Sequence, residues 1–192
     1  DSAAGAPAAQ TFAGQIGTSD NKMGTITVGA TNGRAGSAVF SSDVFSTNMA
    51  IISDNGAGES SLVSLSGSFT GTAITMDDDT GLSKLVVAGT DTTVTGTIDG
   101  AATGEGTLQI TGSGTTIASE VGIGTTDLAA IDVDATTTFS DATEAVAYTV
   151  DADTTFTGAV LANTSMAIAT SGTDVTLSAA SNTGTTTLAS GT

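Results

Sequence analysis

Short runs in which hydrophobic and polar residues alternate recur along the whole chain. Clear examples lie at 25–28, 85–87, 108–110, 131–133 and 175–177, separated by Gly, Ser, Asn and Asp. Alternation with a period of two predicts strands with one buried face, and the separating residues predict tight turns. Few apolar stretches keep a period of 3.6, so we expect little helix.

The strand pattern repeats with related residues. Two threonines followed by a hydrophobic residue occur at Thr92-Thr93-Val94, Thr115-Thr116-Ile117, Thr137-Thr138-Phe139 and Thr154-Thr155-Phe156, with a weaker copy at Thr186-Thr187-Leu188. The hydrophobic residue is followed at i+2 by a small residue and at i+4 by a small or branched one, as at Phe69, Gly71 and Ala73. A period of two places these three positions on one face, which we expect to be the inner one.

Self-similarity of this kind is typical of solenoid proteins. The sequence predicts an all-β chain forming a β-solenoid, or parallel β-helix, of about eight short coils with roughly 17 to 29 residues each. The alternative is a β-sandwich, which would also have frequent turns. We expect one solenoid domain at 11–192, with more degenerate coils at 11–66 and clearer repeats at 67–192.

The N-terminal segment differs from the rest of the chain. Residues 1–10 are mostly small, contain the single proline and lack periodicity. They predict a flexible N-terminal arm. The arm either is a disordered terminus or reaches a neighbouring subunit, where it would add a strand or cover an edge.

The repeats resemble those of a known class of proteins. The segments Thr11-Phe12-Ala13-Gly14-Gln15-Ile16 and Leu128-Ala129-Ala130-Ile131-Asp132-Val133 resemble the strand repeats of bacterial autotransporter passengers and filamentous adhesins. The resemblance covers most of the chain, is strongest after residue 60 and rests on short motifs. It implies a β-helix exported to the cell surface and brings no catalytic residues. A full autotransporter also has a C-terminal membrane barrel, which this sequence lacks.

Charge excludes several partners. The formal net charge is -17, and the bases Lys22, Arg34 and Lys84 all lie in the N-terminal part of the chain. The segment 1–84 also carries eight acids, whereas the segment 85–192 carries twelve acids and no base. Such a surface repels nucleic acid and anionic membranes, and it suits a medium rich in salt or divalent cations. No apolar run has the roughly 20 residues of a membrane helix, so we expect no membrane insertion.

The chain has neither histidine nor cysteine. The usual general base, the usual transition-metal ligand and the Ser-His-Asp triad are therefore absent. Glycoside hydrolysis would need two carboxylates across a cleft. The second half lacks the bases and most of the aromatic residues that line sugar subsites. We expect no enzymatic activity and no catalytic or cofactor-binding residue.

Closely spaced aspartates are the candidate ligands for a metal. The set comprises Asp132, Asp134, Asp151, Asp153, Asp77, Asp78 and Asp79. Asp132 and Asp134 alternate with buried positions, and stacked coils would bring Asp134 within about 5 Å of Asp151. Calcium accepts carboxylates from several strands and would relieve their repulsion. A solvated acidic face is the simpler interpretation, because the sequence has no EF-hand loop and no calcium-binding nonapeptide repeat.

We expect a non-enzymatic, extracellular structural subunit of a filament, surface array or stalk. Its partner would be a second copy of itself, because uncapped solenoid ends expose strand edges that favour head-to-tail stacking. The alternative is an adhesin or passenger rod that presents a ligand-binding loop, at 52–60 or 76–81, to cell-surface glycans. A smaller alternative is an ice-binding protein that uses outward threonines such as Thr136, Thr138 and Thr155.

Overall fold

The computed structural model describes residues 8–30, 35–53, 60–78 and 82–188 of the 192. These residues form strands, turns and loops, and no helix occurs among them. Within the same ranges, accordingly, no helix is long and apolar enough to cross a membrane. The predicted sites at Asp79 and at 54–59, and the segment 1–7 of the predicted arm, lie outside the described residues.

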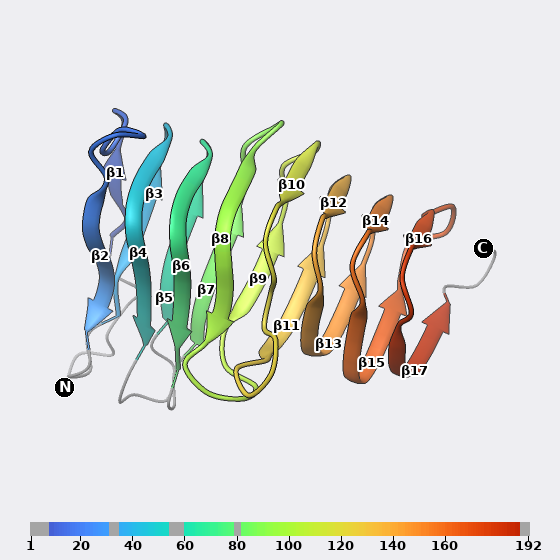
Figure 1. The fold of residues 1–192 in the computed structure, drawn as a ribbon. Helices are drawn as coiled ribbons and strands as arrows, with labels where there is room; N and C mark the ends of the chain where they lie inside the picture. The colour runs from blue at the N-terminus through green and yellow to red at the C-terminus, as the bar shows by residue number, and fades with distance from the viewer. Residues whose placement is uncertain (1–7, 31–34, 54–59, 79–81, 189–192) are drawn as a thin grey trace.

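Successive strands alternate between two sheets that face each other (Figure 1). The nine-stranded sheet contains β1 (Gln10–Phe12), β3 (Ser37–Phe40), β5 (Ser60–Leu65), β7 (Leu82–Val87), β9 (Thr107–Ile110), β11 (Leu128–Val133), β13 (Thr143–Val150), β15 (Val160–Ile168) and β17 (Asn182–Leu188). The eight-stranded sheet contains β2 (Met23–Ala30), β4 (Val44–Ser53), β6 (Phe69–Asp77), β8 (Thr93–Gly100), β10 (Thr115–Ile117), β12 (Thr137–Phe139), β14 (Thr154–Phe156) and β16 (Val175–Leu177). Each coil thus contributes one strand to each sheet.

Every strand pair among the described residues is parallel, for example β11 with β13 and β12 with β14. The predicted parallel β-solenoid is therefore confirmed. The alternative of a β-sandwich is wrong, because sandwich sheets are built from antiparallel strands.

One hydrophobic position recurs in every coil of each sheet. In the nine-stranded sheet the backbone register joins Phe12, Phe40, Leu65, Val87, Ile110, Val133, Val150, Ile168 and Leu188. In the other sheet it joins Ile16, Val44, Phe69, Val94, Ile117, Phe139, Phe156 and Leu177. We call these rows the two hydrophobic ladders. They explain why every copy of the repeat ends in a hydrophobic residue.

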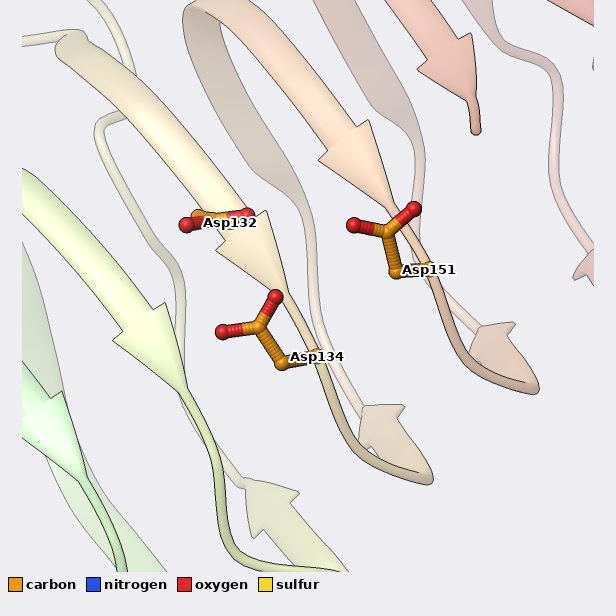
Figure 2. A group of neighbouring side chains, drawn as sticks. All are labelled: Asp132, Asp134 and Asp151. Carbon is orange, nitrogen blue, oxygen red and sulfur yellow. The ribbon is translucent and has the colours of Figure 1, made fainter. Parts of the chain in front are cut away.

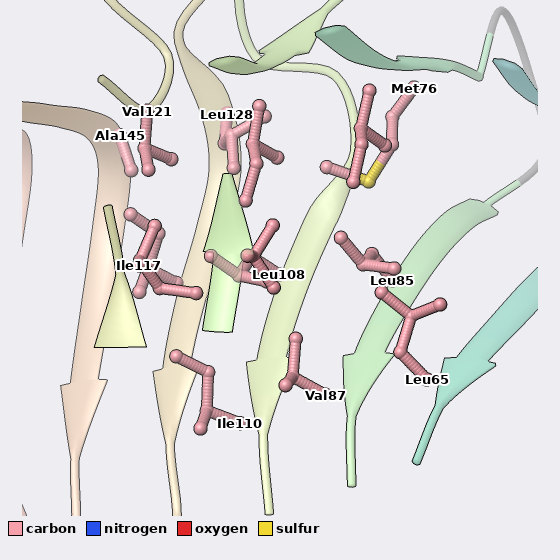
Figure 3. Close-up of a cluster of buried hydrophobic side chains, with 14 of the residues drawn as sticks. Leu65, Met76, Leu85, Val87, Leu108, Ile110, Ile117, Val121, Leu128 and Ala145 are labelled. Atoms are coloured by element: carbon pink, nitrogen blue, oxygen red, sulfur yellow. The ribbon is translucent and has the colours of Figure 1, made fainter. Parts of the chain in front are cut away.

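The core is a narrow band between the sheets (Figure 3). Leu65, Leu85, Leu108 and Ile117 are completely buried in it. Like residues stack on one another, and the rings of Phe139 and Phe156 lie parallel with centroids 4.8 Å apart. Because each sheet contributes a single layer of side chains, the six Phe and the aliphatic residues are enough to fill the core without any Trp.

The coils are longer toward the N-terminal end of the rod than toward the C-terminal end. Phe12 pairs with Phe40 at the N-terminal end, whereas Val133 pairs with the much nearer Val150 further along the chain. The longer strands lie in the eight-stranded sheet near the N-terminal end and in the nine-stranded sheet near the C-terminal end. In the eight-stranded sheet β4 has ten residues and β14 three, whereas in the nine-stranded sheet β3 has four and β15 nine.

One boundary and one side-chain direction differ from the prediction. Gln10 was assigned to the flexible arm but opens β1, where it pairs with Ala38. Ala73 was expected to point inward two positions after Gly71, but the buried side chain is Ile74. A register shift between Thr70 and Ala73 inserts one residue and reverses the parity beyond it.

Candidate functional site

The aspartates that the sequence singled out meet on the outer face of the nine-stranded sheet. Asp132 lies near the end of β11, in register with Gln109 of β9 and Thr149 of β13. Asp134 and Asp151 follow the last residues of their strands, β11 and β13, and those last residues are paired with each other. Because residues two positions apart share a face, Asp132 and Asp134 both leave the chain on the side opposite the core.

Three of these side chains form a compact group, which we call the carboxylate cluster: Asp132, Asp134 and Asp151. One carboxylate oxygen from each residue lies within 4.8 Å of the others (Figure 2). Asp134 is exposed, and Asp132 and Asp151 are half-buried. The predicted stacking of Asp134 near Asp151 is what the coil register produces.

Neighbouring side chains hold the carboxylate cluster in place. The Gln109 side-chain amide donates to Asp134 Oδ2 at 2.6 Å and to Asp132 Oδ2 at 3.2 Å. From the opposite side, Thr170 Oγ1 donates to Asp151 Oδ1 at 3.1 Å. These neutral donors orient the three carboxylates without neutralising their charge.

Burial raises the pKa of Asp132 above its ordinary value, and repulsion from Asp134 and Asp151 raises it further. The positive charge of Lys84 and the hydrogen bond from Gln109 act in the opposite direction but do not cancel the rise. The surroundings of Asp132 therefore oppose its ionisation.

The carboxylate cluster supplies oxygen ligands of the kind that calcium prefers. Three side chains fall short of the six to eight oxygens that calcium takes, so water would have to supply the remainder. The group does not include Asp153, whose Oδ1 accepts the backbone N–H of Asp174 at 2.9 Å. The calcium site remains a prediction.

Asp77 and Asp78 do not belong to the carboxylate cluster. Asp77 ends β6, and Asp78 follows it. Asp78 Oδ2 accepts the backbone N–H groups of Gly106 at 3.2 Å and Ser83 at 3.5 Å. Burial is the main cause of its raised pKa. These two contacts join neighbouring coils, and Asp79, the third residue of the predicted metal site, lies outside the described residues.

Asp127 was not singled out from the sequence, although it is only 2% exposed. Its Oδ1 accepts the Gly104 N–H at 3.1 Å, and its Oδ2 accepts the side-chain amide of Asn163 at 2.8 Å. Asn163 also donates to Glu144 Oε1 at 3.3 Å. The residue thus links loops and strands from several coils. No local sequence signal distinguishes it from the solvated aspartates.

The carboxylate cluster stands on an outer sheet face, whereas glycosidase chemistry places two carboxylates across a cleft that holds the sugar. The described residues also form a hollow at the N-terminal end of the rod, beside Phe12, Val28 and Ala38. Its described lining carries no acid and no base. Neither place combines a pocket with a pair of titratable groups.

The comparisons with known proteins leave the family open. No family model, no curated protein and no solved structure matches this chain. The resemblance to bacterial surface proteins therefore holds at the level of the β-solenoid fold alone.

Proposed function

We propose that this chain is a non-enzymatic structural subunit that stacks end to end into an extracellular filament, surface array or stalk. The observation that carries the proposal is the pair of hydrophobic ladders, which reach the outermost coils at both described ends of the rod. The exported β-helices that the repeats resemble support an extracellular place for it.

The outermost strands support such stacking. The nine-stranded sheet runs from β1 to β17 and the eight-stranded sheet from β2 to β16, so these four strands have one neighbour each. Because every described pair is parallel, a second copy could add its β1 beside β17 and continue the same ladder. The interface would be heterologous and would extend into an open polymer.

Exposed hydrophobic side chains occur at both ends. Phe12 is 44% exposed and Met23 50% at the N-terminal end, and Leu177 is 42% exposed at the C-terminal end. Phe12 and Leu177 belong to the hydrophobic ladders. Residues at the same ladder positions in the middle of the rod, Val87 and Val94, are completely buried. Contact with another copy would bury these end residues as the internal coils already do.

Complementary end variants test the proposal. Purified protein should form uniform polymers in negative-stain electron microscopy. Phe12→Asp and Leu177→Asp should each abolish them, because each places a charge on one stacking face. Leu82→Asp is the matched control, since Leu82 is 62% exposed but lies in β7, away from the ends.

Mixing the two end variants tests the polarity of assembly. Each retains one intact face, so the mixture should form dimers that neither variant forms alone, measured by light scattering after gel filtration. Monomeric wild-type protein would contradict the proposal. Monomers that bind glycans or cells would favour the alternative of a rod that presents a recognition loop.

A further inference from the structure

Outward side chains on the eight-stranded sheet form a regular array of hydroxyl groups. The register of β8, β10, β12, β14 and β16 joins a first row of Thr93, Thr116, Thr138, Thr155 and Thr176. Two positions further along each coil lies a second row of Thr95, Ala118, Ser140, Thr157 and Ser178. We call these ten positions the threonine face. Nine of the ten carry a hydroxyl.

The pairing that supports the threonine face is regular. The strand pairs from β8 to β16 have no register shift, whereas β6 with β8 and β13 with β15 do. Pairing also continues into the second row, where the N–H of Thr157 donates to the Phe139 carbonyl at 2.8 Å. Coils about 4.8 Å apart and a two-residue step of about 6.6 Å give the hydroxyls a rectangular lattice.

The hydroxyls of the threonine face are available to a partner. On the inner side, Thr115, Thr137 and Thr154 each donate to a nearby backbone carbonyl at 2.6–2.7 Å. Among the described residues, the side chains of the threonine face make no hydrogen bond to the protein. All ten positions are at least partly accessible.

The threonine face is also free of charge. The chain has twenty acids, yet none occupies the ten positions. The carboxylate cluster lies on the other sheet. Asp91, Asp153 and Asp174 lie two positions before the first row, with Glu120 two positions after Ala118 of the second row, so these acids stand at the margin of the face. An uncharged array on so acidic a protein suits a neutral, crystalline partner rather than an ionic one.

We propose that the threonine face binds ice. Oxygen positions on a prism plane of hexagonal ice also repeat on a rectangular lattice, whose shorter repeat is close to the coil spacing and whose longer repeat is somewhat larger than the two-residue step. Threonine hydroxyls can take the place of lattice oxygens, and the rigid γ-methyl groups limit the orientations of the water between them. This activity is independent of end-to-end stacking, although stacked copies would lengthen the array and add avidity.

The sequence-based interpretation named Thr136, Thr138 and Thr155. Thr138 and Thr155 are neighbours in the first row. Thr136 precedes the inward Thr137, and its carbonyl accepts the N–H of Gly114 at a turn. We therefore place Thr136 outside the threonine face. The second row was not anticipated.

Thermal hysteresis and inhibition of ice recrystallisation test the proposal. The wild-type protein should show both activities, and Thr138→Lys and Thr155→Lys should lose most of each, because a long charged side chain breaks the lattice. The matched control is Thr149→Lys, an outward, half-buried threonine on the other sheet. Circular dichroism melts should confirm that all three variants remain folded.

Two results would overturn the proposal. One is a wild-type protein with neither activity at millimolar concentration. The other is equal loss in the control and in both face variants. Pull-down on microcrystalline cellulose is a third measurement, since binding there without thermal hysteresis would assign the threonine face to a neutral polysaccharide instead. None of these three results would bear on polymer formation, which is measured separately by electron microscopy.

Discussion

At the scale of single residues, the paired threonines have two distinct roles. The first threonine of each pair points inward with the hydrophobic residue two positions later, and the second points outward. Parity along the strand predicts this arrangement, because residues i and i+2 share a face. In Thr115, Thr137 and Thr154 the hydroxyl can be buried because it donates to a carbonyl of the preceding turn.

The inward threonines offer a matched pair of variants. Thr137 Oγ1 donates to the Ala135 carbonyl at 2.7 Å, whereas the buried Thr92 Oγ1 has no partner among the described residues. Thr137→Val should lower the free energy of unfolding by about 1 kcal/mol, and Thr92→Val should raise it by about 1 kcal/mol. Urea unfolding measures both. Equal effects in the two variants would show that the hydrogen bond is irrelevant.

Asp132 predicts a pH dependence of stability. Its folded pKa is raised above the unfolded value of 3.8, so the folded protein binds a proton more readily than the unfolded chain. The destabilisation caused by its ionisation is present above the folded pKa and disappears as the pH falls toward 3.8. Asp132→Asn should therefore be more stable than wild type at neutral pH, with the difference shrinking on acidification.

Urea melts from neutral pH down to about pH 4 measure this difference. Asp153→Asn is the control, because an amide oxygen can still accept the N–H of Asp174. A stability difference between Asp132→Asn and wild type that is independent of pH would contradict the argument.

At the scale of strands, much of the fold follows from periodicity. The runs at 85–87, 108–110 and 131–133 all lie in strands of one sheet and are in register with one another. Parallel stacking of like residues follows from the repeat itself. The shift at Thr70 and Ala73 does not, because an inserted residue leaves no signal that one sequence can distinguish from ordinary variation.

Phe156 tests how cooperative the stacked strands are. It is completely buried, stacks on Phe139 and meets the edge of Tyr148 at 6.1 Å. Phe156→Ala should lower the free energy of unfolding by about 3–5 kcal/mol. Because each coil contacts only its neighbours, amide hydrogen exchange should accelerate most in β12 to β17. Uniform acceleration from β2 to β17 would instead indicate a single cooperative unit.

At the scale of the whole molecule, coil register decides which predicted ligands meet. The spacing of Asp134 and Asp151 equals the length of one coil, so the sequence could predict their proximity. The hydrogen bond from Gln109 to Asp134 could not be predicted in this way, because Gln109 lies in a coil of different length and only the three-dimensional register shows that the two residues are close. The buried position of Asp127 could not be predicted for the same reason, because its partners Gly104 and Asn163 come from other coils.

The distribution of charge along the rod predicts its response to cations. The segment 85–192 carries twelve acids and no base, so their mutual repulsion opposes folding and is weakened by salt. Sodium chloride should therefore raise the melting temperature.

If the carboxylate cluster binds calcium, calcium chloride at the same ionic strength should raise the melting temperature further, because a bound ion stabilises the folded state by mass action. The extra rise should disappear in Asp134→Asn, which removes one carboxylate of the cluster, and persist in Asp91→Asn, an exposed acid elsewhere on the rod. Equal rises in the two salts, or an extra rise that survives in Asp134→Asn, would leave the carboxylate cluster as a solvated acidic face.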